Sequence, residues 1–530
     1  MTSPITGGRR AGMLIPLFSI PSSDSWGIGE IPDLVPLSEW LASAGQRLVQ
    51  LLPINEMPSQ ESSPYSSLSA MAIDPQFIAP GHVEDVVAIG GERALGTTDR
   101  RTLQRIRAAA HVLYPDVRRL KTAVLALAWA RFRDEALEPD TPRGRAFREY
   151  CRTESWWLDD YALFRALRAR SGERPWLEWP APLRDRDQDA LASARTACAD
   201  EIGYRSYLQW VAQQQWQSMR TRIAPVELFG DLPFTVATDS ADVWARQREF
   251  RLDVSVGVPP DAFSATGQDW GLPACRWDVM AAADFPWLRD RARRYAALYD
   301  GFRVDHLVGF YRTYYRTTSG GEGQFTPDTE EAQTALGERV LDVFRSAGAR
   351  VTAEDLGTVP DFVRASLVRL GVAGYKVFRW EREWHRDGQP YVDPVSYPPI
   401  SVATSGTHDT EPGSVWWAGA SLDERRAVLA VPSVRAHLTE AECLAAEVSA
   451  EWPDAARDAV LEALNAAASE LLILPFQDPF GWSDRVNEPA TVNDRNWTWR
   501  LPWPVDALAT QPDALRVARR LRAWAERYRR

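Results

Sequence analysis

The sequence predicts an α/β protein: a (β/α)8 (TIM) barrel with a helical insertion subdomain and no C-terminal β-domain. Three observations predict it. Short apolar runs recur eight times, amphipathic helical patterns lie between most of them, and the chain stops in a helical pattern. Apolar strands that alternate with helices are typical of a parallel sheet covered by helices, and eight such units close a barrel. The candidate strands span residues 13–17, 47–53, 226–233, 301–306, 350–357, 374–380, 401–409 and 470–479.

The predicted organisation is a single catalytic barrel over residues 1–530, interrupted by insertions. Residues 85–222, between the second and third strands, are too many for one crossover and contain several helical patterns, so we expect a mainly helical insertion there. Residues 257–280 and 410–469 are expected to be further insertions around the active-site cleft. That cleft is expected at the C-terminal ends of the barrel strands.

Composition excludes some classes of partner. The formal net charge is −11, from 61 basic and 72 acidic residues, which argues against nucleic acid and against an anionic membrane surface. No apolar stretch approaches the roughly 18 residues of a membrane-spanning helix, and the first residues lack the apolar core of a signal peptide. We therefore expect a cytoplasmic protein. The oligomeric state cannot be inferred from the sequence.

Tryptophan is unusually frequent, with 23 residues. Flat aromatic faces pack against the C–H face of a pyranose ring as they pack against other apolar groups. Most individual tryptophans are expected to serve packing instead. Their number still favours a sugar-binding protein.

Charged residues gather at the ends of four predicted strands. In a parallel barrel these ends meet at one face, where catalytic residues lie. The residues in question are Asp231 on the third strand, Arg303, Asp305 and His306 on the fourth, Glu354 and Asp355 on the fifth, and His408 and Asp409 on the seventh.

Two of these carboxyl groups suit glycoside cleavage with retention. That reaction needs an ionised nucleophile and a protonated acid about 5–5.5 Å apart, and neighbouring strands lie about 4.8 Å apart. Asp305 is the predicted nucleophile and Glu354 the predicted general acid/base. Arg303 lies two residues before Asp305, so both side chains face the same side of the strand, and its charge would keep Asp305 ionised. Taken alone, such a pair is more often structural.

His408 and Asp409 offer hydrogen bonds to sugar hydroxyls, although a lone His-Asp pair is usually a surface or core feature. Metal catalysis is not supported, because the six histidines show no HExxH or comparable spacing. Cys151, Cys198, Cys275 and Cys443 lack CxxC spacing, so neither a zinc site nor a disulfide framework is predicted. No phosphate-binding GxxxxGK[ST] motif is present.

The chain also resembles a known family along nearly the whole barrel. The similar segments are GIGEIPDL, AGQRLVQLLPINE, SPYSSLSAMAIDP (63–75), GDLPFTVATDSADVWA (230–245), GVPPDAFSATGQDWGLPACRWD (257–278), FRVDHLVGF (302–310), AEDLGTVP (353–360), GTHDT (406–410), LPFQDPFGW and RVNEPATVNDRNWTWR (485–500). In this order they resemble the 4-α-glucanotransferases (amylomaltase, disproportionating enzyme) of glycoside hydrolase family 77, relatives of the α-amylases. The segment from GVPPD to RWD is the most specific.

The resemblance implies roles for individual residues. Asp305 would be the nucleophile, Glu354 the acid/base and Asp409 the stabiliser of the transition state. The implied substrate contacts are Ser63, Tyr65, Asp231, Asp261, Trp270, Arg303, His306, His408 and Asn496. Asp261 and the loop from Ser264 to Trp270 would belong to an acceptor-side loop. The family needs no cofactor, and no metal is implied.

The implied reaction is transfer of an α-1,4-glucan segment from a maltooligosaccharide donor to glucose or a maltooligosaccharide acceptor, within starch and glycogen metabolism. Three alternatives stay open: an α-glucan hydrolase of the amylase clan, a non-catalytic glucan-binding protein, and a transferase that uses an unusual sugar acceptor. Thr410–Glu411–Pro412 departs from the family's usual continuation after His408–Asp409 and bears on acceptor choice.

Overall fold

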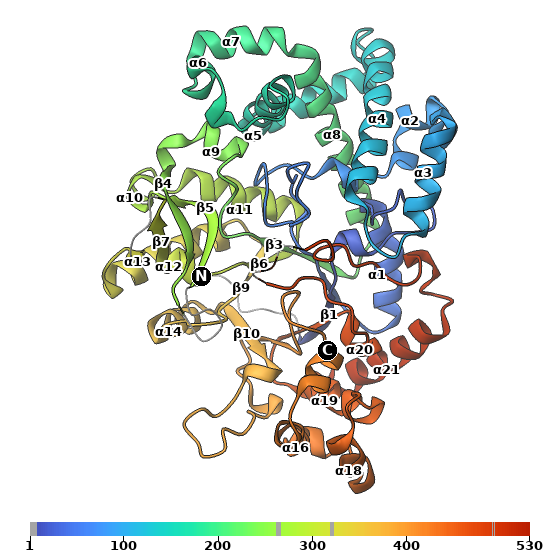
Figure 1. The fold of residues 1–530 in the computed structure, drawn as a ribbon, viewed down its shortest axis with the longest axis vertical. Coiled ribbons are helices and arrows are strands. Elements are labelled where there is room, and N and C mark those ends of the chain that lie inside the picture. Colours follow the sequence, from blue (N-terminus) through green and yellow to red (C-terminus); the bar gives the residue numbers. More distant parts are fainter. Residues whose placement is uncertain (1–7, 261–266, 319–322, 490, 492) are drawn as a thin grey trace.

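The computed structural model describes residues 8–260, 267–318, 323–489, 491 and 493–530. Its centre is a closed barrel of eight parallel strands in the order β1-β12-β11-β10-β9-β6-β3-β2 (Figure 1). The barrel strands are β1 (Arg10–Leu14), β2 (Leu48–Gln50), β3 (Glu227–Leu232), β6 (Gly301–Val304), β9 (Arg350–Ala353), β10 (Ala373–Val377), β11 (Ser401–Thr404) and β12 (Leu471–Pro475). The predicted (β/α)8 barrel is therefore confirmed, and each predicted strand overlaps one of these.

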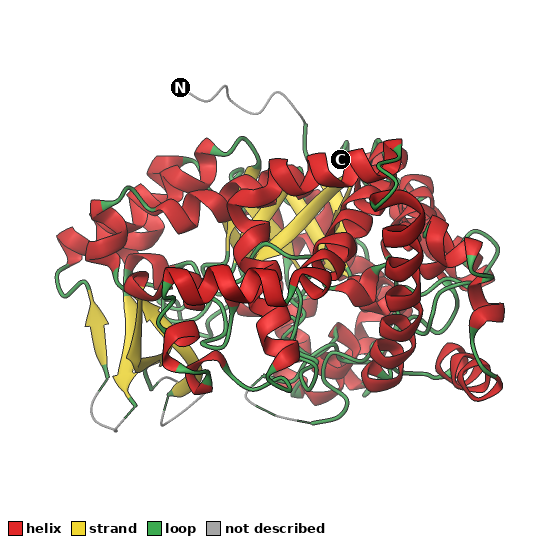
Figure 2. Cartoon of the chain, turned by 90° about the horizontal axis from the view of Figure 1, so that it is seen from above, coloured by secondary structure: helices red, strands yellow, loops and turns green. Residues whose placement is uncertain are grey.

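Helices surround the barrel, as seen from above in Figure 2. Those that connect or flank the barrel strands are α1 (Leu34–Ser43), α8 (Ala199–Arg222), α11 (Pro286–Leu298), α13 (Glu330–Ser346), α14 (Asp361–Leu370), α19 (Asp454–Ala466) and α21 (Pro512–Tyr528). The connection from β10 to β11 differs, because it contains two 3₁₀ turns, Phe378–Trp380 and Pro394–Ser396. The last strand, β12, is followed by α20 (Gln477–Phe480) and finally by α21.

Two groups of helices extend beyond the barrel. One lies between β2 and β3 and forms the upper part of Figure 1: α2 (Glu84–Ala88), α3 (Thr97–Ala108), α4 (Tyr114–Phe132), α5 (Pro142–Arg170), α6 (Ala181–Arg184), α7 (Gln188–Ala197) and α8. The other precedes α19: α15 (Gly413–Gly419), α16 (Leu422–Leu429), α17 (Pro432–Arg435) and α18 (Glu440–Val448). Short helices α9 (Ala241–Ala245), α10 (Trp277–Ala282) and α12 (Val308–Tyr311) complete the set.

A second sheet, which the sequence analysis did not predict, lies beside the barrel. Its strands are β4 (Phe250–Val258), β5 (Gln268–Cys275), β7 (Thr313–Thr317) and β8 (Gln324–Thr326), in the order β5-β4-β7-β8. All three pairings are antiparallel. The strands mix charged and apolar residues, as strands do when one face of the sheet is solvated, so they lack the apolar runs that identify the barrel strands.

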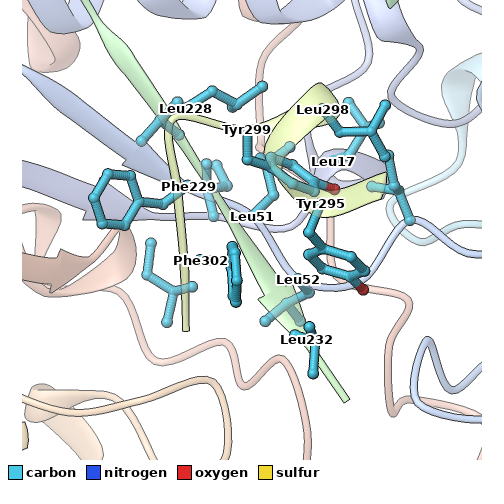
Figure 3. Packing of buried hydrophobic residues seen from close by; sticks show 14 of the residues in the cluster. Leu17, Leu51, Leu52, Leu228, Phe229, Leu232, Tyr295, Leu298, Tyr299 and Phe302 are labelled. Atoms are coloured by element: carbon cyan, nitrogen blue, oxygen red, sulfur yellow. The ribbon is translucent and has the colours of Figure 1, made fainter. Parts of the chain in front are cut away.

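The packing of α11 on β3 and β6 connects the core to the strand ends. Tyr295 and Tyr299 lie against Phe302 and the apolar residues of β3 (Figure 3). The buried hydroxyl of Tyr295 donates to the main-chain oxygen of Asp231, at 3.1 Å. Burying a large side chain of this kind contributes about 1.5–3 kcal/mol. The same contacts that stabilise this side of the barrel therefore fix the backbone at the end of β3.

Candidate active site

The strand ends bring the predicted residues together. In the pairing of β3 with β6, Asp231 lies directly opposite Arg303. The ladder continues one residue beyond the strands: the N–H of Asp305 donates to the oxygen of Leu232, and the N–H of Glu354 donates to that of Val304, both at 3.0 Å. Asp305 and Glu354 therefore leave neighbouring strands at the same level.

Arg303 is the centre of the site. One of its nitrogens, Nη1, donates to both carboxylate oxygens of Asp231, at 2.6 and 2.7 Å. The other, Nη2, lies 2.9 Å from Oδ1 of Asp305 and 3.9 Å from Oε2 of Glu354. Burial disfavours the charge of Arg303, but Asp231 and Asp305 hold its pKa well above the usual range. The guanidinium is therefore a fixed cation shared by three carboxyl groups.

The same two distances limit the separation of the catalytic pair. Since Nη2 of Arg303 is 2.9 Å from one oxygen and 3.9 Å from the other, Oδ1 of Asp305 and Oε2 of Glu354 are at most about 6.8 Å apart. Retaining enzymes need about 5–5.5 Å, and inverting enzymes about 6.5–9.5 Å to leave room for water. This limit accommodates the separation of a retaining enzyme and excludes most of the range of an inverting one.

Glu354 carries the protonation state that a general acid needs. Only 14% of its side chain is exposed. Burial is the largest influence and raises its pKa, and the charges of Asp305 and Asp355 add to this against the opposing Arg303, so that the pKa reaches about 7. Its oxygens also accept hydrogen bonds from the N–H groups of His306 and Leu356, at 2.9 and 3.2 Å. The acid is both oriented and easily protonated near neutral pH.

His306 is held in a strained backbone conformation beside Glu354. Its φ of +44° lies in the left-handed region, which few non-glycine residues adopt, although histidine does so more readily than most. This turn aims the N–H of His306 at Glu354. The ring lies edge-on to Trp270, with centroids 4.7 Å apart, and to Phe234, at 5.5 Å. Burial, aided by Arg303, lowers the pKa of His306 to about 4, which leaves the imidazole neutral.

Tyr65 and His408 form a second layer on the Asp231 side. The hydroxyl of Tyr65 donates to Oδ2 of Asp231, at 2.8 Å, and lies 2.9 Å from Nε2 of His408. The two rings are stacked 5.4 Å apart, and Trp497 packs against both. Burial is the largest influence on Tyr65 and, with the charge of Asp231, raises its pKa well above 10. The phenol therefore stays a neutral donor.

Asp409 is the most accessible carboxylate of the group, with 43% of its side chain exposed. Its Oδ2 lies 3.3 Å from Nε2 of His408, and its Oδ1 accepts a hydrogen bond of 2.6 Å from Asn487. Desolvation in the site raises its pKa, but His408 and Asn487 outweigh this and bring it to about 2. Arg485 also donates to the main-chain oxygen of Asp409, at 2.9 Å. Asp409 is thus held as an anion.

Three other predicted contacts have different places. Ser63 accepts a long hydrogen bond from the N–H of Tyr65, at 3.4 Å, so it belongs to the turn that carries Tyr65. The amide of Asn496 is bound within its own loop, to Glu488 and Thr491. Asp261 lies outside the described residues, as does Ser264. The sequence analysis missed Asn487 and Trp497, whose local sequence carries no signal for contact with residues 78 or more positions away.

The departure at Thr410–Glu411–Pro412 has a structural role. Glu411 forms an ion pair of 2.9 Å with Arg379, whose side chain is buried. Arg379 also donates to the main-chain oxygens of Ser405 and Glu411. Thr410 accepts from the N–H of Thr407, at 3.0 Å. These contacts fix the turn that carries His408 and Asp409.

Neither a metal cluster nor a membrane span was found in the part of the chain that the structure describes. No group of three or more His, Cys, Asp or Glu side chains there could hold a metal ion. No helix there is long and apolar enough to cross a membrane.

The chain is similar to proteins of known class over almost all of its length. The family model Glyco_hydro_77, 4-alpha-glucanotransferase, matches residues 15–506. A 4-alpha-glucanotransferase of Thermus thermophilus is 31% identical over 519 residues, which cover 93% of this chain and 95% of that protein. One from Chlamydia pneumoniae is 30% identical over 503 residues, covering 94% and 92%. The structure of amylomaltase from Streptococcus agalactiae in complex with acarbose superposes with a TM-score of 0.81, at 25% identity, and covers 98% of this chain and 99% of that one.

The barrel, with carboxyl groups gathered at its strand ends, defines an enzyme of the glycoside-cleaving barrel class. Within that class, the chain belongs to the 4-α-glucanotransferases of glycoside hydrolase family 77, enzymes that transfer glucan segments. The predictions of the family and of its transferase activity are therefore confirmed. Hydrolysis and a non-catalytic role are not favoured.

Proposed function

We propose that this enzyme transfers α-1,4-glucan segments between maltooligosaccharides by a retaining double displacement, with Asp305 as nucleophile and Glu354 as acid/base. The observation that carries the assignment is the position of Arg303, which lies between the two carboxyl groups. Its Nη2 lies 2.9 Å from Oδ1 of Asp305 and 3.9 Å from Oε2 of Glu354. Glu354, with a pKa of about 7, is partly protonated at neutral pH. One group is thus suited to attack and the other to donate a proton.

In the first step, a carboxylate oxygen of Asp305 attacks the anomeric carbon of the donor. The bond from that carbon to the glycosidic oxygen breaks, and this oxygen takes the proton of Glu354. A glycosyl ester on Asp305 results. In the second step, the 4-hydroxyl of an acceptor gives its proton to Glu354 and attacks the same carbon. The ester bond breaks, Asp305 is regenerated, and two inversions give retention.

The other residues would act on the sugar. Asp409, as an anion beside the reaction centre, would stabilise positive charge on the sugar ring in the transition state. His408 would exchange a hydrogen bond with a sugar hydroxyl group, and Asp231, which has no exposed surface, would act through Arg303 and Tyr65. Trp270 and His306, which pack together, would form an apolar wall for the ring at the acceptor side.

The substrates that we propose are α-1,4-glucans and maltooligosaccharides as donors, with glucose or a maltooligosaccharide as acceptor, in starch and glycogen metabolism. The expected compartment is the cytoplasm, which cell fractionation followed by an activity assay tests. Incubation with pure maltotriose tests the reaction. Transfer gives glucose together with maltopentaose and longer chains. Maltose and glucose alone, with no longer products, would contradict the proposal.

A further inference from the structure

A second candidate binding feature lies outside the residues assigned above. It is a groove of about 890 Å³, bounded by Pro21–Ser23 after β1, by the end of α3 and the residues up to His111, and, after β12, by Trp482, Asp484 and residues 499–504. We call it the Trp482 groove. Because β1 and β12 are neighbours in the barrel, the groove lies at the edge of the face that carries the active site.

Aromatic rings form a rigid platform in this groove. Trp482 and Trp503 are both partly exposed, and their ring centroids are 5.4 Å apart at an interplanar angle of 62°. Phe480 is stacked behind Trp482 at 4.2 Å, and the buried Trp499 lies 6.2 Å from it. Partly exposed tryptophan rings that are held in place by aromatic packing are suited to contact the C–H face of a sugar.

Polar side chains with unused hydrogen-bonding capacity stand around the platform. Gln104, His111 and Asp484 line the groove and are exposed. Within the described residues, their side chains make neither a hydrogen bond nor an ion pair. Amide, imidazole and carboxylate groups are the donors and acceptors that sugar hydroxyls require. Together with the rings, they form the combination of flat apolar and polar surface that a neutral carbohydrate fits.

The charges of the groove disfavour an anionic ligand. Arg107 and Arg500 line it, but their guanidinium groups are already used. Arg107 donates to the main-chain oxygens of Ser25 and Asp24 and pairs with Glu92. Arg500 donates through Nη1 and Nη2 to the main-chain oxygens of Ile106 and Arg107, at 2.7 and 3.1 Å, while its buried Nε has no hydrogen-bond partner among the described residues. Neither arginine presents a free Nη group to a phosphate or a carboxylate.

The groove is continuous with the active site along the chain. Three residues after Trp482, Arg485 donates to the main-chain oxygen of Asp409, and two residues further, Asn487 donates to its carboxylate. The segment that forms one wall of the groove therefore ends at the predicted transition-state stabiliser. A glucan chain long enough to occupy both places would run along this segment.

We infer that the Trp482 groove binds a stretch of a long α-glucan chain outside the catalytic site, and so retains polymeric donors near the carboxylates. This inference rests on the proposed glucan transfer. It predicts that affinity for long glucans depends on the groove, whereas turnover of maltotriose does not.

The test measures affinity for glycogen by native-gel retardation, in an Asp305→Asn background that prevents turnover. Trp482→Ala should raise the Kd for glycogen at least about fivefold. Trp482 packs on Phe480, so its replacement could disturb the packing. The double variant His111→Ala/Asp484→Ala changes only exposed groups and is therefore a second test. It should raise the Kd for glycogen about threefold or more. Trp384→Ala removes a tryptophan that is 58% exposed outside the groove, and should leave the Kd unchanged.

The same substitutions in the active enzyme separate this inference from the proposed function. Their kcat/KM for maltotriose should stay within about twofold of the parent enzyme. An unchanged glycogen Kd in both groove variants, with transfer intact, overturns the inference. So does a shift to a smaller species on gel filtration without loss of glycogen affinity, which would make the groove an interface between copies. Failure of the parent enzyme to extend maltotriose would instead refute the proposed function.

Discussion

Arg303 holds Asp231 through one nitrogen, which donates to both carboxylate oxygens at 2.6 and 2.7 Å, and so leaves its second nitrogen free to face Asp305. Asp231 has no exposed surface, and Arg303 is only 4% exposed. The ion pair fixes the direction of the guanidinium. Asp231 is thus a positioning residue for the charge that acts on the nucleophile, besides being a predicted sugar contact.

Replacing Arg303 should separate stability from catalysis. Arg303→Ala leaves Asp231 buried without its cation, which should lower the free energy of unfolding by about 3–5 kcal/mol. Arg303→Lys keeps the charge but loses the forked geometry, so its stability should fall less, while kcat/KM should fall at least about a hundredfold. Urea unfolding and maltotriose kinetics measure both. A lysine variant of full activity would show that the shared guanidinium is unnecessary.

The pH profile should follow Glu354. The protonated form, which donates to the leaving oxygen, is present below a pKa of about 7 and is lost as the pH rises above it. We therefore expect kcat/KM to fall above about pH 7, since this parameter reports the free enzyme.

A neighbouring charge makes this assignment testable. Asp355 helps to raise the pKa of Glu354. In Asp355→Asn the alkaline fall should therefore begin at a lower pH, while Asp361→Asn, an exposed change at the start of α14, should leave the profile in place. If the fall stays at the same pH in both variants, another group controls it.

Asn487 should act through Asp409. It donates the 2.6 Å hydrogen bond to Oδ1 of that carboxylate. We expect Asn487→Ala to reduce kcat by about tenfold or more, with a smaller change in KM, because the lost contact orients a group that acts in the transition state. Glu488→Gln, at the exposed next position, serves as the control. Equal effects of the two substitutions would indicate a general disturbance of the loop.

His306 should remain neutral throughout the working range. Burial and Arg303 lower its pKa to about 4. NMR spectra of histidine-labelled protein contain signals from six histidines, and the one that is missing from the His306→Asn spectrum belongs to His306. In the parent protein this signal should show no titration between pH 5 and 8. Asparagine is chosen because it tolerates the left-handed backbone. A titration of that signal near pH 6.5 would contradict the described environment.

The sequence predicts the barrel well for a physical reason. Strands buried on both faces, such as β12 with its Leu471–Pro475 run, are apolar throughout. Polar residues follow shortly after such runs. Asp305 and Glu354 stand directly at such boundaries. Their proximity then follows from the neighbouring positions of β6 and β9 in the barrel.

Other features depend on contacts that no local pattern encodes. The second sheet joins two antiparallel pairs, β4 with β5 and β7 with β8, through a β4–β7 pairing between segments far apart in the chain, and its strands are partly solvated. Asn487 reaches Asp409 only because the chain returns to the strand ends after β12. Asn496, in contrast, is bound within its own loop by neighbours five and eight residues away.

Trapping the glycosyl-enzyme tests most directly whether Asp305 is the nucleophile. Glu354→Gln is incubated with α-maltosyl fluoride, whose fluoride leaves without protonation, so the ester forms although its breakdown lacks a base. Peptide mass spectrometry then locates the sugar. We expect a maltosyl adduct on the peptide that contains Asp305, and none in the double variant Asp305→Asn/Glu354→Gln. An adduct on another carboxylate, or transfer activity that survives in Asp305→Asn, would contradict it.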